Sequence, residues 1–247
     1  MKVTLIDFTG NGSPNPARHA VNILLFTKST RLNMTPDFML KIAEMPEDEV
    51  MFNLRVMAGT NPGSWEFVNF TFLMEGVSRM FTQQLQRTRQ ASYAQQSFRV
   101  VEVQDFTFET GPTIASDRTI VGAYKNTMNN AFQCYKFLID AGANVEDARG
   151  VLPLNTHTNL CMSINMRNFI GMARKRTSGR VQGEYRGVMD ACIMEIEKVY
   201  PWFYIFYKND QMKAYKDLIE LIGDSNLSQE EKTEMYRKID IIKSGLD

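Results

Sequence analysis

The sequence has few of the residues from which metal centres and nucleophilic triads are commonly built. Its 247 residues include two histidines, His19 and His157, and three cysteines, Cys134, Cys161 and Cys192, with no CxxC pair. So few histidines give poor support to a histidine-based metal centre or a Ser-His-Asp triad. Widely spaced cysteines in odd number indicate reduced, mostly buried thiols, so neither a disulfide frame nor a metal site is predicted.

Net charge and long apolar runs are also absent. The 28 basic residues balance the 28 acidic ones, which argues against a partner that is a nucleic-acid polymer. No apolar run reaches the roughly 18 residues of a membrane span, and residues 1–7 lack the layout of a signal peptide. We therefore expect a cytoplasmic protein without a membrane partner. The glycines of residues 10–16 form neither GxGxxG nor a P-loop.

Alternating and apolar segments predict the strands. Residues 1–7 alternate between apolar and polar side chains and predict a strand. The aromatic-rich run at residues 67–74 predicts a buried strand or helix. The alternating run at residues 101–108 predicts a hairpin arm or a surface insertion.

Helical spacing and capping residues predict several helices. Residues 76–86 and 114–141 have helical patterns, and Gly142 is expected to end the second. The pair at residues 35–36, Thr then Pro, predicts a helix start. A capping box at residues 228–231 predicts the start of the last helix.

The most informative stretch is Arg87 to Arg99. Its thirteen residues contain three arginines, two serines and three glutamines, with no Lys, Asp or Glu. The planar fork of arginine matches pairs of phosphate or carboxylate oxygens, and serine hydroxyls add neutral donors. A solvated basic surface is the simpler interpretation. The apolar run before the stretch favours a defined anion site instead, because a buried element would fix the position of the arginines.

Two later segments carry similar groups. In residues 142–153, Asn144 is predicted to cap a short helix whose last turn projects Arg149 before a Leu-Pro stop. Further along, Asn165 and Arg167 precede Arg176, and the pattern Gln-x-Glu-x-Arg follows at residues 182–186.

These three segments resemble the motifs of the flavin-dependent thymidylate synthase family (ThyX). The family signature is Arg-His-Arg-x-x-Ser-x-Asn-Glu-x-Ser-x-Arg, and here Thr88, Ala94 and Gln95 replace its His, Asn and Glu. The family pattern Glu-x-Ala-Arg-x-x-Leu-Pro is kept around Arg149. The pattern Asn-x-Arg-(x)8-Arg, followed by His-x-Gln-x-Glu-Ile-Arg, is kept except that Arg180 replaces the His and Tyr stands in place of the Ile. The resemblance spans about residues 60 to 187.

The resemblance implies a fold and an assembly. We expect an α+β protein whose central antiparallel sheet is flanked by helices in a single catalytic domain of residues 1–210. A C-terminal helical extension is expected at residues 211–247. The family also implies a homotetramer whose active sites are shared between subunits.

The resemblance further implies the reductive methylation of dUMP to dTMP, with FAD, NADPH and methylenetetrahydrofolate. This scheme needs no enzyme nucleophile, in agreement with the lack of cysteine in these segments. The implied catalytic residue is Arg176, beside the pyrimidine ring. The implied cofactor-binding residues are Glu66, Arg87, Thr88, Arg89, Gln95, Asn165 and Arg167. The implied substrate-binding residues are Gln84, Gln95, Gln96, Ser97, Phe98, Arg99, Arg149 and Arg176.

Two alternatives remain at this point. Gln95 both donates and accepts hydrogen bonds, so a related C5 methyl or hydroxymethyl transfer to dUMP or dCMP also fits. The other alternative is a flavin- or nucleotide-binding homologue without catalysis.

Overall fold

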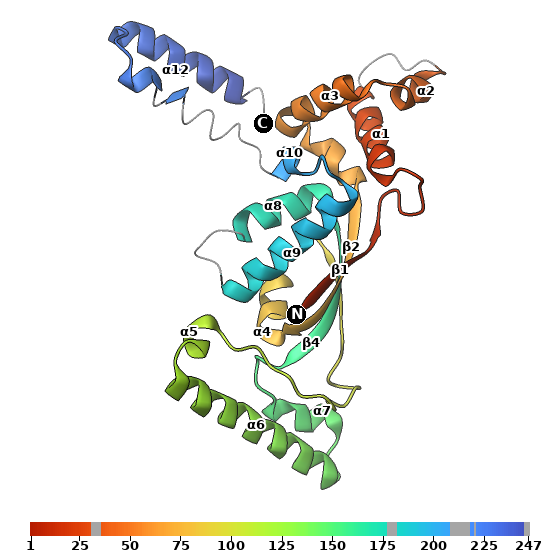
Figure 1. Ribbon diagram of the computed structural model, residues 1–247, viewed down its shortest axis with the longest axis vertical. Coiled ribbons are helices and arrows are strands. Elements are labelled where there is room, and N and C mark those ends of the chain that lie inside the picture. Colours follow the sequence, from red (N-terminus) through yellow and green to blue (C-terminus); the bar gives the residue numbers. More distant parts are fainter. Residues whose placement is uncertain (31–35, 177–181, 208–217, 220, 245–247) are drawn as a thin grey trace. The chain divides into compact units, whose positions relative to one another are not determined.

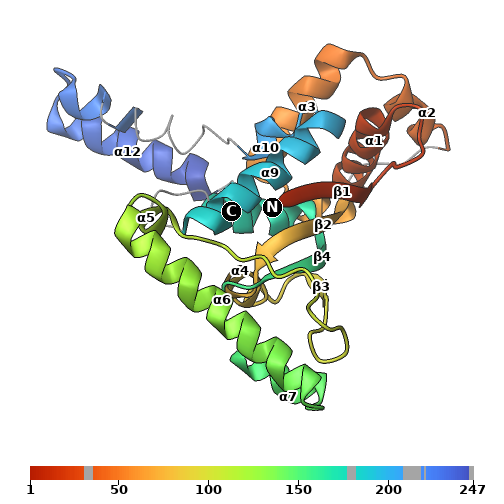
Figure 2. The ribbon, with the colours of Figure 1, turned by 60° about the horizontal axis from the view of Figure 1, so that its bottom comes forward.

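Alternation of apolar and polar residues makes two long strands the centre of a sheet. The computed structural model describes residues 1–30, 36–176, 182–207, 218–219 and 221–244. Its four-stranded sheet has the order β1-β2-β4-β3; β1, β2 and β4 are labelled in Figure 1, and β3 in Figure 2. The strands are β1 (Lys2–Phe8), β2 (Asn69–Ser78), β3 (Ser92–Gln95) and β4 (His157–Asn165).

Neighbouring strands in this sheet run antiparallel. β1 pairs with β2 from Lys2 opposite Glu75, and β3 pairs with β4 from Ser92 opposite Ser163. Between β2 and β4, Thr71 Oγ1 donates to Ser163 Oγ at 3.4 Å, and the Gly76 N–H donates to Asn159 Oδ1 at 3.1 Å. The residue numbers of the partners on β4 decrease as those on β2 increase, so these strands are also antiparallel. The predicted α+β class is confirmed.

One face of the sheet is buried. Phe70, Phe72 and Met74 alternate along β2 and are each 0% exposed, and Leu160 and Met162 on β4 are also buried. Burying a large apolar side chain stabilises a fold by about 1.5–3 kcal/mol. This face therefore forms the main core of the sheet.

The chain divides into two compact units. The first comprises Met1–Phe8, Asn69–Ile164 and Gly171–Ile196, and contains the sheet. In Figure 2 its longest helix, α6, runs from α5 to α7, which packs against it. Its other helices are short, apart from α9. Its helices are α4 (Arg79–Leu85), α5 (Pro112–Ala115), α6 (Arg118–Asp140), α7 (Val145–Ala148), the 3-10 helix η2 (Arg149–Val151) and most of α9 (Gly183–Val199).

The second unit comprises Thr9–Val68, Asn165–Ile170 and Glu197–Asp247, and its described elements are all helical. Its helix α1 packs against α2, α3 and η1. Trp65 and Phe206 meet edge to face with centroids 5.2 Å apart. The helices are α1 (Pro16–Ser29), α2 (Phe38–Ala43), α3 (Glu47–Thr60), the 3-10 helix η1 (Pro62–Phe67), α10 (Tyr204–Tyr207) and α12 (Gln229–Ser244). Helix α8 (Met166–Arg176) begins in this unit and ends in the first.

The predicted domains, residues 1–210 and 211–247, are continuous stretches of chain, whereas each compact unit combines several separate segments. The boundary between the predicted domains lies outside the described residues, and the domain division therefore stays a prediction. Among the helices of the described residues, none combines the length and apolar character that a bilayer span requires.

Several predicted elements change in detail. Residues 76–78, expected to be helical, extend β2, because Gly76 bonds to β4; α4 begins at Arg79 with Ser78 as its N-cap. The alternating run at residues 101–108 forms no strand, and Phe108 makes one isolated bridge in the described part of the chain. The helix expected over residues 114–141 is broken into α5 and α6, with Asp117 capping the latter.

Other boundary predictions have mixed outcomes. The helix start expected at residues 35–36 is wrong, since α2 begins at Phe38; Thr35 itself lies outside the described residues. Gly142 follows α6 with φ of 89° and ends it as expected, because glycine tolerates this conformation. The capping box is confirmed, with Ser228 and Glu231 bonded to each other.

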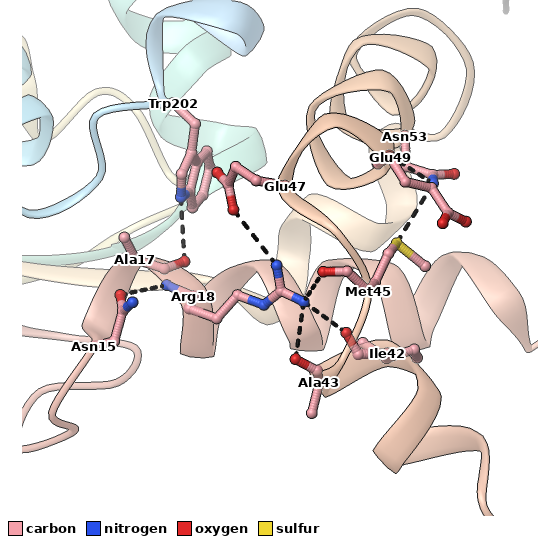
Figure 3. A network of polar contacts seen from close by, with 10 residues as sticks. All are labelled: Asn15, Ala17, Arg18, Ile42, Ala43, Met45, Glu47, Glu49, Asn53 and Trp202. Atoms are coloured by element: carbon pink, nitrogen blue, oxygen red, sulfur yellow. Dashed lines mark hydrogen bonds and ion pairs between the residues drawn. The ribbon is translucent and has the colours of Figure 1, made fainter.

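A single arginine joins two helices of the second unit (Figure 3). Arg18 Nη2 donates to the carbonyls of Ile42 at 2.8 Å, Ala43 at 3.1 Å and Met45 at 2.9 Å. Its Nη1 lies 3.6 Å from Glu47 Oε2, at the start of α3. The guanidinium thus adds a charged donor to carbonyls at and just beyond the end of α2, where the helix itself supplies few donors.

We predict that Arg18→Met lowers the free energy of unfolding of the second unit by about 2–4 kcal/mol, because three carbonyls lose their charged donor. Denaturant unfolding followed by tryptophan fluorescence would measure the loss. The matched control is Arg55→Met, at an exposed arginine on α3. Equal stability of the two variants would contradict the assigned role.

Candidate active site

The junction of β2 and α4 fixes the start of the candidate site in the first unit. Ser78 is fully buried, and its N–H and hydroxyl donate to the Glu184 carboxylate at 2.7 and 2.6 Å. The same hydroxyl accepts the Phe81 N–H at 3.0 Å. A serine N-cap satisfies a free donor of the first turn. The pairing therefore joins the beginning of α4 to the beginning of α9.

The turn after α4 presents two predicted cofactor arginines. Arg87 and Arg89 are exposed and form no ion pair among the described residues. The Tyr93 hydroxyl donates to the carbonyls of Leu85 at 3.1 Å and Thr88 at 2.9 Å. One proton is shared between two acceptors, and this tyrosine ties the turn to β3. No sequence signal marks Tyr93, because its position in the signature is variable.

Arg176 and Thr88 come together around one tyrosine. The Arg176 Cζ lies 4.9 Å from the ring centroid of Tyr185, a cation–π geometry. The Tyr185 hydroxyl is buried and makes no hydrogen bond with the described residues. Burial raises the pKa of Tyr185, while the nearby Arg176 and Thr88 act in the opposite direction. Arg176, the predicted catalytic residue, and Thr88, which replaces the signature histidine, therefore both lie near Tyr185.

Two pairs of amides lie beside the turn. Gln84 Nε2 donates to Gln182 Oε1 at 2.7 Å, and Gln86 Nε2 donates to Gln95 Oε1 at 2.8 Å. The Nε2 of Gln95 is buried and has no hydrogen-bond partner in the described part of the chain. A buried donor without a partner is costly unless a ligand accepts from it. Gln95 thus retains a donor for a bound molecule.

The two predicted phosphate arginines meet at Glu146. Arg99 Nε lies 3.0 Å from Glu146 Oε2, and Arg149 Nε donates to the Glu146 carbonyl at 3.1 Å. The Ser97 hydroxyl accepts the Arg99 N–H at 3.2 Å, which fixes the turn before Arg99. The Glu146 carboxylate therefore pairs with Arg99 alone, while Arg149 contacts the Glu146 backbone, which leaves the charge of Arg149 without a carboxylate partner among these contacts. The importance of Glu146 was not predicted, because its partner lies 47 residues away in the sequence.

The two remaining predicted substrate residues are held by the protein itself. Gln96 Oε1 accepts from Asn159 Nδ2 at 3.1 Å, and the Gln96 N–H donates to the Asn159 carbonyl at 2.9 Å. The Phe98 side chain is 5% exposed. Both residues anchor the signature segment to its surroundings.

The second unit contains the other predicted cofactor residues. Glu66 Oε1 and Arg167 Nη1 form an ion pair at 2.5 Å, with both side chains about half exposed. Asn165 Oδ1 accepts the Asn168 N–H at 2.9 Å and so caps α8. Part of the Asn165 side chain therefore has a structural role. Arg180, which replaces the later family histidine, lies outside the described residues.

The sequence model of a family described as thymidylate synthase complementing protein matches residues 13–202. The chain belongs to this family. The membership expected from the three motifs is confirmed.

Three relatives of this chain are named flavin-dependent thymidylate synthases. The protein of Clostridium tetani is 29% identical over 219 residues, which cover 81% of this chain and 84% of the relative. That of Sulfolobus acidocaldarius is 29% identical over 208 residues, covering 81% and 74%. That of Pyrococcus abyssi is 34% identical over 157 residues, covering 62% and 64%.

The pKa of Tyr93 gives a prediction for alkaline pH. Burial, and secondarily Tyr185, raise this pKa to about 12. The neutral phenol is favoured in the folded state, so its stabilisation is complete below the ordinary pKa of about 10 and is lost as the pH rises towards 12. We predict that Tyr93→Phe makes unfolding less dependent on pH between about pH 10 and 12 and costs about 1 kcal/mol at pH 7 through the lost hydrogen bond.

Unfolding in denaturant across this pH range would measure both effects. Tyr204→Phe, at an exposed tyrosine, is the control. The same pH dependence in Tyr93→Phe and in the unmodified protein would refute the assignment.

Proposed function

We propose that this protein is a flavin-dependent thymidylate synthase, which methylates dUMP reductively at C5 to give dTMP. The observation that supports the proposal most strongly is the meeting of Arg99 and Arg149 at Glu146. These arginines come from two separate family motifs, and their contacts with the same residue support the recognition of a single phosphate by both.

The proposal gives each substrate residue a role. Arg99 and Arg149 hold the phosphate, with the Ser97 turn supporting Arg99. Gln84 and Gln95 provide amide donors and acceptors, and the unpaired Nε2 of Gln95 supports contact with a carbonyl of the base. Gln96 holds the signature segment through its hydrogen bond with Asn159, and Phe98 holds it through the burial of its side chain.

Arg176 is proposed to act on the pyrimidine ring. Its guanidinium lies over the aromatic ring of Tyr185, which restricts its orientation. A fixed positive charge beside the base stabilises the negative charge that develops as C5 becomes nucleophilic. Holding the nucleotide by its phosphate lets this interaction form without a further loss of orientational freedom.

The donor set is suited to FAD. Arg87 and Arg89 have no acidic partner in the described parts of the chain and so retain their charge for an anionic cofactor. The residues proposed to bind FAD are Glu66, Arg87, Thr88, Arg89, Gln95, Asn165 and Arg167. When bound, FAD supplies the hydride and relays the one-carbon unit, with methylenetetrahydrofolate as carbon donor and NADPH as reductant. We also propose a cytoplasmic homotetramer in which several subunits complete each site.

One observation favours testing a second substrate. Gln95 stands in place of a family glutamate, and an amide pairs with either cytosine or uracil. C5 methyl or hydroxymethyl transfer to dCMP, or hydroxymethyl transfer to dUMP, is therefore the alternative reaction. A binding protein without catalysis is the alternative of a different class.

We predict tritium release from C5-labelled dUMP by purified protein with FAD, NADPH and methylenetetrahydrofolate, because methylation replaces the hydrogen at C5. The product mass then separates methyl from hydroxymethyl transfer. Release from labelled dCMP alone would transfer the proposal to the cytosine nucleotide. If neither nucleotide releases tritium while flavin is bound, the synthase proposal is overturned.

Arg176→Ala should lower turnover by a factor of about 100–1,000, because the charge beside the ring is lost, while FAD binding persists. Absorbance of the bound flavin and single-turnover product formation would measure the two properties separately. The matched control is Lys175→Ala, which removes an exposed cation from the same helix. Unchanged turnover in Arg176→Ala would refute the catalytic role.

A further inference from the structure

A third arginine lies beside the two that meet at Glu146. Arg79 is the first residue of α4, outside all three family motifs, and its side chain is partly buried. Its guanidinium Cζ lies 4.8 Å from the ring centroid of Phe98. Since Phe98 immediately precedes Arg99, this stacking fixes Arg79 next to the phosphate segment of the signature.

Backbone hydrogen bonds connect Arg79 to the segment of Arg149 as well. The Arg79 N–H donates to the Thr156 carbonyl at 3.1 Å, and the Met80 N–H donates to the Leu154 carbonyl at 2.8 Å. Residues 154–156 follow closely on η2, which begins at Arg149. The start of α4 therefore lies against the chain that positions Arg149.

The charges of this region are not balanced. Arg79 forms no ion pair within the described residues, and the nearest partner of Arg149 is a backbone carbonyl. Burial, and then the positive charge of Arg149, lower the pKa of Arg79. Glu146 is already paired with Arg99. Two adjacent, partly buried cations without a carboxylate repel each other, and a bound dianion would remove this cost.

We propose that Arg79 binds the 5′-phosphate of the nucleotide directly, as a third arginine beside Arg99 and Arg149. The inference rests on the proposed function for the identity of the nucleotide. The phosphate is recognised by three guanidinium groups from three separate segments: the start of α4, the end of the signature, and η2. The Phe98 ring holds the Arg79 fork in place, which reduces the entropy lost on binding.

The test compares ligands with and without the phosphate. We expect Arg79→Met to weaken dUMP binding about tenfold or more, because charge-assisted hydrogen bonds to the phosphate are lost, and to change deoxyuridine binding by less than about twofold. Arg79→Lys should fall between, since lysine keeps the charge and loses the planar fork. Calorimetric titration of the full chain would give the dissociation constants.

Two controls separate phosphate binding from general effects. Arg118→Met removes an exposed arginine of α6 and should leave dUMP affinity unchanged. Arg149→Met should reproduce the selective loss of dUMP binding. Unchanged dUMP affinity in Arg79→Met, or equal losses for dUMP and deoxyuridine, would overturn the inference and leave the proposed function standing.

Inorganic phosphate tests the site independently of the nucleotide. A ligand that binds the folded state raises the midpoint of thermal unfolding. Stabilisation of the unmodified protein by phosphate, absent in Arg79→Met, would support the inference even if no pyrimidine nucleotide bound and the proposed function failed. If phosphate stabilises neither protein, and the unmodified protein binds no dUMP, both proposals are overturned.

Discussion

The carboxylate of Glu184 fixes the geometry on which the candidate site of the first unit depends. It accepts two short hydrogen bonds from Ser78, a fully buried residue at the N-cap of α4. A carboxylate at this end of a helix meets free N–H groups and the positive end of the helix dipole. Because Glu184 lies in the first turn of α9, the same interaction aligns α4 with α9. The bond between Gln84 and Gln182 follows from that alignment.

What the sequence could predict had local signals. The aromatic-rich run at residues 67–74 indicated a buried strand or helix, and β2 contains a series of buried side chains that alternate with partly exposed ones. The excess of arginine between residues 87 and 99 indicated an anion site, since no acid in that segment neutralises it. The motifs supplied the remaining site residues, because a family pattern already encodes which distant segments meet.

What the sequence could not predict depends on contacts between distant segments. Gly76 has a helical neighbourhood in the sequence, but its bond to Asn159 on β4 keeps it in a strand. Arg79 lies in a sequence that resembles any helix start. Only its stacking on the Phe98 ring and its interaction with the charge of Arg149 indicate a role at the site. Glu146 likewise became important only when its pairing with Arg99 was visible.

The departures from the family signature leave the signature segment, residues 87–99, with only cationic and neutral side chains. Thr88 and Gln95 replace residues that change charge with pH, and Gln84 is also uncharged. Selection between pyrimidines would then depend on hydrogen-bond complementarity at the amides, while the arginines bind the phosphate and stabilise charge on the ring. An amide matches more than one base, whereas a carboxylate demands a donor. Under the proposed function, the replacement at Gln95 would relax the electrostatic part of base selection and leave phosphate recognition to the arginines.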